Sequence, residues 1–260
     1  MSDQIVLPAD FSQHLEIPNA EERLSEAMTV ALKMLEAGVP LRPNPDHAAI
    51  FCDPPQLVAG PLKKLGYVAG WDTRCYPSPV DGHDYINVPS GLPTQSPARA
   101  QGWFDYVAVV HPVDEDARDH MLSQGYGNPF IHHITWGLAP PARAQGGELD
   151  YAGQLVSFMA TVRKRIVETL ADEPGTLILA LPRDVVESPE FSDRTTEWLG
   201  DLTEQEYQIE AMQGGGFLLQ FFVLTGGRIE VALRVATQQT FNPKSVDKIS
   251  KDEISTMQSD

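Results

Sequence analysis

The stretch "NPFIHHITWGL", residues 128–138, has the pattern of a buried β-strand with two adjacent histidines near its entrance. Alternate residues of a strand point to opposite faces of its sheet. One face would be small and polar, with His133, Thr135 and Gly137. The other would be bulky and would pack under a helix, with His132, Ile134, Trp136 and Leu138. We therefore predict that this strand begins a structural unit and that His133 faces a cavity.

The composition is that of a folded globular protein. Of the 260 residues, 42% are apolar and 21% are charged. A chain of this length buries a substantial core, either as one large domain or as two packed halves. The two cysteines, Cys52 and Cys75, are too few for a disulfide framework or a cysteine zinc site. These features are typical of a protein from a reducing compartment, and we expect a cytoplasmic one.

The charge of the chain narrows the class of its partner. The formal net charge is −17 at pH 7, which opposes binding to phosphate backbones and to anionic lipid. The sequence contains no 18-residue apolar run and no export signal at its start. We expect a small-molecule substrate, no nucleic acid and no membrane. A homodimer is the assembly we consider.

The first half of the chain predicts a helix and then a mixed α and β unit. Apolar residues recur at helical spacing over 20–37, and Gly38 ends that helix, so residues 1–43 form an N-terminal helical segment. The segment 44–112 then indicates the order β-α-β-β-β. Its elements are "HAAIFC", a strand that opens with His47, the helix "PPQLVAGPLKKLGY", and the strands "VAGWDTRCYP", "DYINVP" and "WFDYVAVVHP".

The second half predicts the same plan again. A short acidic helix within 113–128 connects the halves, and the unit 129–237 begins with the strand quoted above. A long amphipathic helix follows it, then the strand "TLILALP", mixed helical sequence, and three strands, "YQIEAM", "FLLQFFVL" and "GRIEVALRV". The tail, residues 238–260, is predicted as a loose segment, a helix or a lid. We expect an α+β fold built from two βαβββ modules.

Two histidines and one carboxylate lie at corresponding places in these predicted modules. His47 and His133 are each placed in the first strand of a module, and Glu230 is in the last strand of the second. In "RIEVALRV", strict alternation would place Glu230 on the polar face with Arg228 and Arg234. This set has the composition of a metal site in a pocket. Alternatively, each residue is a polar group at a strand rim or on a solvated edge.

The pattern resembles the vicinal oxygen chelate superfamily, which includes glyoxalase I, bleomycin-resistance proteins, extradiol dioxygenases and 4-hydroxyphenylpyruvate dioxygenase. "HAAIFC" and "HITWGL" are similar to the family's first strands, which begin with a ligand histidine. "GGRIEVALR" is similar to its last strand, where a ligand glutamate follows an aliphatic residue. The resemblance covers about residues 44–237. It implies paired βαβββ modules around a metal-centred cavity, with His47, His133 and Glu230 as ligands.

The resemblance also separates two kinds of chemistry. Glyoxalase-type sites add a fourth ligand from the last strand of the first module, where this chain offers Asn87 or residues 107–108 and no clear Glu or Gln. A set of two histidines and one carboxylate suits Fe(II) that binds substrate and dioxygen together. We therefore expect a non-haem Fe(II) dioxygenase acting on a 2-oxo acid, catechol or hydroxyketone. The alternatives are a lyase or isomerase with Zn, Ni, Co or Mn, and a non-catalytic binding or resistance protein.

Other residues are secondary candidates for the site. Arg228 and Arg234 could hold a substrate carboxylate, although surface ion pairs explain them equally well. Phe221 could line the cavity or simply belong to the core. His132 would replace His133 if the strand register differs by one residue. His111, at the end of "YVAVVHP", is a reserve ligand together with Asn87.

Overall fold

The computed structural model describes residues 15–69, 74–77, 82–93, 95–100, 104–170, 174–212, 216–225 and 228–236. The proposed C-terminal helix or lid, within 238–260, lies outside this part of the chain. The contacts of the chain form two compact units, each of which is described by itself. Of the described residues, the first unit contains those within 1–26 and 44–134, and the second unit contains those within 27–43 and 135–239.

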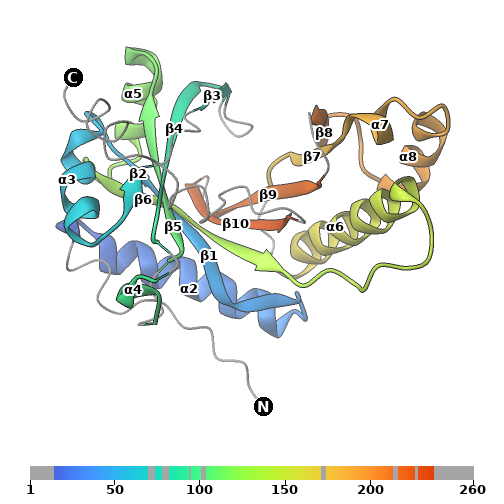
Figure 1. The fold of residues 1–260 in the computed structure, drawn as a ribbon, viewed down its shortest axis with the longest axis horizontal. Coiled ribbons are helices and arrows are strands. Elements are labelled where there is room, and N and C mark those ends of the chain that lie inside the picture. The colour runs from blue at the N-terminus through green and yellow to red at the C-terminus, as the bar shows by residue number, and fades with distance from the viewer. Residues whose placement is uncertain are drawn as a thin grey trace. The chain divides into compact units, whose positions relative to one another are not determined.

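The N-terminal helix predicted over 20–37 is confirmed as α2, Ala20–Glu36 (Figure 1). Two acidic residues in its first turn and Lys33 in its last turn favour it electrostatically. Gly38, with a φ of 74°, ends this helix, because glycine adopts the left-handed conformation without steric strain. The backbone N–H groups of Gly38 and Val39 donate to the carbonyls of Leu35 and Met34, which closes the helix end.

The first module follows the predicted order, except that the structure divides the predicted strand "VAGWDTRCYP" into two strands and adds a short helix before the last strand. Its elements are β1 (Leu41–Phe51), α3 (Gln56–Lys64), β2 (Val68–Ala69), β3 (Arg74–Pro77), β4 (Asp84–Gly91), α4 (Pro97–Ala100) and β5 (Tyr106–Pro112). The strands lie in the order β2-β4-β5-β1, and β3 pairs with β4. β1 runs parallel to β5, and β5 runs antiparallel to β4. The last strand of the module therefore lies beside its first.

The second module repeats that strand order. After α5 (Glu115–Ser123) come β6 (Phe130–Leu138), α6 (Glu148–Leu170), β7 (Leu177–Pro182), α7 (Arg183–Val186), α8 (Phe191–Leu199), β8 (Tyr207–Met212), β9 (Leu218–Thr225) and β10 (Arg228–Ala236). Its strands lie in the order β6-β10-β9-β7, with β8 added beyond β7. Again the first strand neighbours the last. The predicted α+β fold with two βαβββ-type modules is confirmed by this repeated order.

The prediction that the first strand opens at His47 is wrong. β1 begins at Leu41, so His47 is an interior residue of the strand. The sequence did not predict a strand before His47, because Pro43 and Pro45 lack the N–H that a central strand needs. The two prolines fit because β1 pairs with β5 only from His47 onward. Likewise β6 begins at Phe130, three residues before His133.

The core of the first unit lies between the sheet and α5. It contains Ala49 and Phe51 from β1, Ala108 and Val110 from β5, Ala117 and Met121 from α5, and also Tyr85, Tyr126 and Phe130. The Asp114 side chain accepts a hydrogen bond from the Ala117 backbone N–H at 2.8 Å and so caps α5. Residues opposite each other in the β1–β5 pair share a face, so the face with Phe51 and Val110 also carries His47 and Tyr106.

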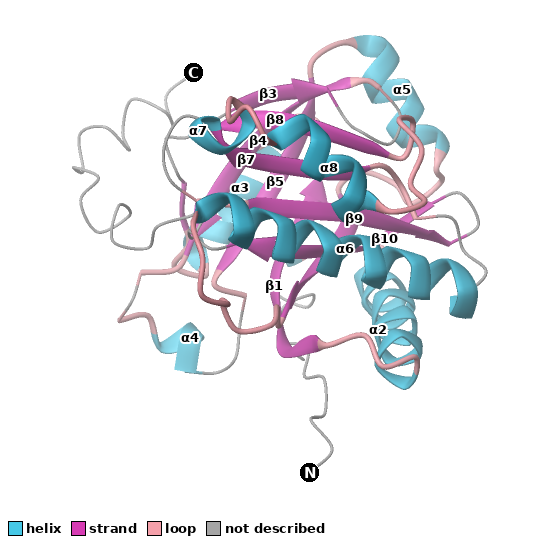
Figure 2. Ribbon diagram, turned by 90° about the vertical axis from the view of Figure 1, so that its right-hand side faces the viewer, coloured by secondary structure: helices cyan, strands magenta, loops and turns pink. Residues whose placement is uncertain are grey.

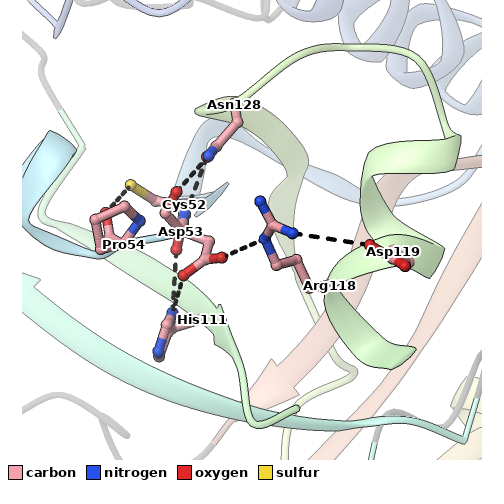
Figure 3. A network of polar contacts seen from close by, with 7 residues as sticks. All are labelled: Cys52, Asp53, Pro54, His111, Arg118, Asp119 and Asn128. Carbon is pink, nitrogen blue, oxygen red and sulfur yellow. Dashed lines mark hydrogen bonds and ion pairs between the residues drawn. The ribbon is translucent and has the colours of Figure 1, made fainter. Parts of the chain in front are cut away.

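A polar network joins four segments at the end of β1 (Figure 3). The Asn128 side chain pairs with both backbone polar groups of Asp53, accepting from its N–H at 2.9 Å and donating to its carbonyl oxygen. The Asp53 carboxylate binds Arg118 Nε at 2.7 Å and lies 3.5 Å from His111 Nδ1. These contacts hold the start of β6 and α5 against the end of β1 within the first unit.

The second unit packs two helices against its strands. Figure 2 shows α6 and α8 lying across one face of β7 and β9. Leu155, Val156, Met159 and Ile166 form the buried stripe of α6. Gly153 lets α6 approach α8, because a Cβ at that position would overlap the Trp198 indole. Among the described residues, no helix is long and apolar enough to cross a membrane.

Candidate metal centre

Three histidines of the first unit come together on two strands. His47 belongs to β1, and His132 and His133 belong to β6. Their exposed fractions are 8%, 6% and 7%, so all three are buried. The ring centroids of His47 and His133 are 6.1 Å apart, and those of His132 and His133 are 5.0 Å apart. The fold therefore gathers imidazoles that are distant in sequence.

The surroundings of His47 define its tautomer. Its Nδ1 lies 3.0 Å from Oδ2 of Asp46. A carboxylate only accepts hydrogen bonds, so Nδ1 carries a proton, and in the neutral ring Nε2 carries the lone pair. The His47 ring also stacks on Tyr106, with centroids 4.3 Å apart and planes 22° apart. Tyr106 is the residue opposite His47 in the β1–β5 register.

His133 is held as a neutral ring. Burial lowers its pKa well below 6.5, and the neighbouring His132, His47 and Arg23 lower it further. Its Nδ1 lies 2.8 Å from Nδ1 of His132, so one of these nitrogens donates and the other accepts. Neutral imidazole is the form that binds metal ions. In the tautomer in which Nδ1 of His133 donates to His132, Nε2 of His133 carries the lone pair and is suited to ligation.

Arg23 fixes the backbone of β6 at the histidines. Its Nε donates to the Ile131 carbonyl oxygen and its Nη2 to the His132 carbonyl oxygen, both at 2.9 Å. Nη1 donates to the Tyr126 hydroxyl at 2.9 Å, and the guanidinium carbon lies 4.0 Å from the centroid of that ring. Only 2% of Arg23 is exposed. The guanidinium is thus a buried structural bridge between α2 and β6.

Sequence reasoning missed Arg23 and Tyr106. A signal for Arg23 exists, because it lies four residues before Ala27 and seven before Val30, on the buried stripe of α2. An arginine on such a stripe needs internal acceptors. No comparable signal marks Tyr106, because its position opposite His47 follows from the pairing of β1 with β5.

The structure leaves the side chains of Glu230 and Arg228 outside the described residues. Both belong to the backbone of β10 in the second unit. The register of β10 with β9 shifts between Ile229 and Val231. An irregularity of this kind interrupts the alternation of faces. Strict alternation along β10 therefore does not establish that Glu230 and Arg234 lie on the same face.

Arg234 and Phe221 are both buried in the second unit, at 7% and 0% exposure. In the β9–β10 register, Phe221 pairs with Leu233 and Arg234 pairs with Gln220. Opposite residues share a face and consecutive residues do not. Arg234 and Phe221 therefore lie on opposite faces of this strand pair.

Asn87 and His111 lie on opposite faces of the β4–β5 pair. Asn87 is opposite Val110, on the face that also carries Tyr106, whereas His111 is opposite Ile86. The Asn87 Oδ1 atom is buried and has no hydrogen-bond partner among the described side chains. His111 Nδ1 lies 3.3 Å from the Cys52 carbonyl oxygen, so His111 is part of the network in Figure 3.

The histidine cluster suits a divalent ion in its donor chemistry. One ion bound at about 2.1 Å by each nitrogen can span two imidazoles whose centroids are 6.1 Å apart. Nδ1 of His47 is engaged by the Asp46 carboxylate, the arrangement that orients ligand histidines in metal sites. Nδ1 of His133 is engaged by His132. Among the described side chains, no group of three or more His, Cys, Asp or Glu residues is arranged to hold a metal.

The chain was compared with known proteins. No protein-family model and no curated protein matches it. A mutant 4-hydroxymandelate synthase from Streptomyces coelicolor is similar in structure at 11% identity and a TM-score of 0.40, over 83% of this chain and 54% of that one. Methylmalonyl-CoA epimerase from Mycobacterium tuberculosis is similar at 11% identity and a TM-score of 0.37, over 74% of this chain and 86% of that one.

A third similar structure is a fusion of a xylose isomerase-like TIM barrel with 4-hydroxyphenylpyruvate dioxygenase. It has 12% identity and a TM-score of 0.37, over 84% of this chain and 30% of that one. The chain therefore spans about half the length of the hydroxymandelate synthase and less than a third of the fusion protein. The likeness is a distant one and concerns the fold alone.

Proposed function

We propose that this protein is a metal-dependent enzyme in which Nε2 of His47 and Nε2 of His133 bind one divalent ion. The observation that carries the proposal is the engagement of Nδ1 in both rings, by Asp46 for His47 and by His132 for His133. A carboxylate partner fixes the tautomer and the ring orientation of a ligand histidine. The contact with His132 leaves Nε2 of His133 able to bind the ion in the tautomer in which Nδ1 donates. Burial keeps His133 neutral and thus able to bind a cation without prior loss of a proton.

We further propose Glu230 as the third ligand, on the sequence resemblance alone. Two imidazoles and one carboxylate leave coordination positions open, and this set is typical of Fe(II) oxygenases. When bound, a ferrous ion would supply activation of dioxygen toward a substrate that chelates through two oxygens. The chain's own residues would hold the two imidazoles in place, through Asp46 on β1 and through Arg23 beneath β6.

The first module favours a dioxygenase over a four-ligand lyase. His47 of β1 lies on one face of the sheet. On that face β5 presents Tyr106, Ala108, Val110 and Pro112, and none of these residues has a carboxylate or imidazole. Asn87 lies on this face opposite Val110, four residues along β5 from Tyr106. That distance is about 13 Å at 3.3 Å per residue, too far for Asn87 to share an ion with His47. The module thus offers no fourth ligand on β5.

The proposed activity predicts oxygen uptake that depends on iron and on both histidines. Protein reconstituted with Fe(II) would be assayed with a catechol, an aromatic 2-oxo acid and an α-hydroxyketone, with and without oxygen. We expect uptake with one of these classes, and its loss in His47→Ala and His133→Ala but not in His120→Ala. His120 is a matched control because it lies on α5, outside the cluster.

Turnover that persists without oxygen would favour a lyase or isomerase using Zn, Ni, Co or Mn. Uptake with none of the three classes would contradict the dioxygenase. Ligand binding that survives in His133→Ala would favour a binding or resistance protein.

A further inference from the structure

Tyr106 lies where the first module could have supplied a further ligand. In the parallel β1–β5 pair it is directly opposite His47, so both side chains leave the same face. β5 is the last strand of the first module, and its residues farther along this face are Ala108 and Val110. Of the β5 residues on this face, Tyr106 is therefore the one beside the proposed metal ligand.

The contact between the two rings is specific in its geometry. Their centroids are 4.3 Å apart and their planes 22° apart, which is a stacked arrangement rather than an edge contact. Only 8% of His47 is exposed, whereas Tyr106 is partly exposed and packs against the core of the first unit. The phenol ring thus covers one face of the imidazole.

Tyr106 and Asp46 constrain His47 in different ways. The carboxylate of Asp46, 3.0 Å from Nδ1, sets which nitrogen carries the proton. A stacked ring restricts rotation of the imidazole out of its plane. Because Asp46 precedes His47 on β1 and Tyr106 lies opposite it on β5, both the proton position at Nδ1 and the plane of the ring are defined before any ion binds. Preorganised ligands bind metals more tightly than ligands that must be ordered.

We infer that Tyr106 is a positioning residue for the metal ion: its ring, rather than its hydroxyl, holds His47 in the plane required for ligation. The inference rests on the proposed function, because it assumes that His47 is a ligand. It predicts that removing the hydroxyl while keeping the aromatic ring changes the affinity for the ion little. Removal of the ring should weaken binding of the ion without unfolding the protein.

The test measures binding of Co(II) to the full-length protein by competition with a chromophoric chelator, and records the visible Co(II) spectrum. Tyr106→Ala should raise the dissociation constant about tenfold or more, the usual effect of losing a residue that orients a ligand. Its spectrum should change. The lost packing lowers its urea midpoint, but the protein should remain folded in the absence of urea. Tyr106→Phe should restore the dissociation constant and the spectrum of the wild type. Tyr151→Ala, at a partly exposed position in the second unit, is the control.

Each outcome decides one claim. If Tyr106→Ala binds Co(II) as the wild type does while His47→Ala binds it weakly, the inference about Tyr106 is wrong and the metal site stands. A spectrum and affinity altered equally by Tyr106→Phe and Tyr106→Ala would assign the role to the hydroxyl and overturn the inference. If His47→Ala binds as tightly as the wild type, the proposed function itself fails.

Discussion

His133 lies in surroundings that oppose a positive charge. It is buried, it contacts His132, and its pKa is held well below the 6.5 of an exposed imidazole, first by burial and then by His132, His47 and Arg23. Between the folded pKa and 6.5, the unfolded chain takes up a proton that the folded protein does not. The stability that His133 contributes is thus complete above 6.5 and falls as the pH decreases below it.

This difference predicts a pH-dependent stability in metal-free protein. The free energy of unfolding should decrease by up to about 1.4 kcal/mol per pH unit through this one residue as the pH falls below about 6.5. Urea unfolding measured at pH values of about 7.5 and 5.5 checks it. His133→Gln should reduce the pH dependence, whereas His120→Gln should leave it unchanged. An equal dependence in wild type and His133→Gln would show that His133 does not carry the effect.

The strands were predictable from sequence to different degrees. The alternation in "HHITWGL" correctly indicates a strand, but it does not predict that Nδ1 of His132 lies 2.8 Å from Nδ1 of His133. The start of β1 was not predicted because Pro43 and Pro45, which are unusual within a strand, follow it. On β10 the register shift between Ile229 and Val231 interrupts a pattern that looks regular in sequence. Local periodicity predicts whether a segment is a helix or a strand. It does not reveal where the pairing register of a strand shifts.

The candidate site was predictable only in part, for a related reason. Histidines within two similar strands can be found in the sequence, and the structure places His47 beside His133. The contact of Tyr106 with His47 depends on which strands pair, and that pairing joins segments far apart in the chain. The role of Arg23 depends on backbone carbonyls of β6, which have no sequence signature. Nonlocal contacts of this kind require the fold.

Two helical glycines should respond differently to an added Cβ. A Cβ at Gly153 would overlap the Trp198 indole, whereas a Cβ at Gly60 of α3 would meet no residue within 4 Å other than its chain neighbours and its own helix backbone. Gly153→Ala should cost about 1–3 kcal/mol, because a well-packed contact must be displaced. Gly60→Ala should change stability by less than about 1 kcal/mol, because its better helix propensity is offset by the contact of the new Cβ with the following Pro61. Denaturant midpoints measure both, and a neutral Gly153→Ala would contradict the close packing.

At the scale of the molecule, the repeat explains how the proposed ligands meet. Each module places its last strand beside its first, giving β2-β4-β5-β1 in one copy and β6-β10-β9-β7 in the other. The two first strands, β1 and β6, are neighbours in the sheet, which brings His47 to His133 across a long stretch of sequence. The same rule places Tyr106, on the last strand of the first module, beside His47. Strand order, rather than any local motif, therefore assembles the site.

The central claim is that His47 and His133 bind one metal ion, and metal content tests it most directly. Protein reconstituted anaerobically with Fe(II) and freed of loose metal should retain about one equivalent per chain. His47→Ala and His133→Ala should each retain less than about a tenth of an equivalent, and His120→Ala should match the wild type. Glu230→Ala measured alongside them tests the third ligand. Equal iron in the wild type, His47→Ala and His133→Ala would contradict the site.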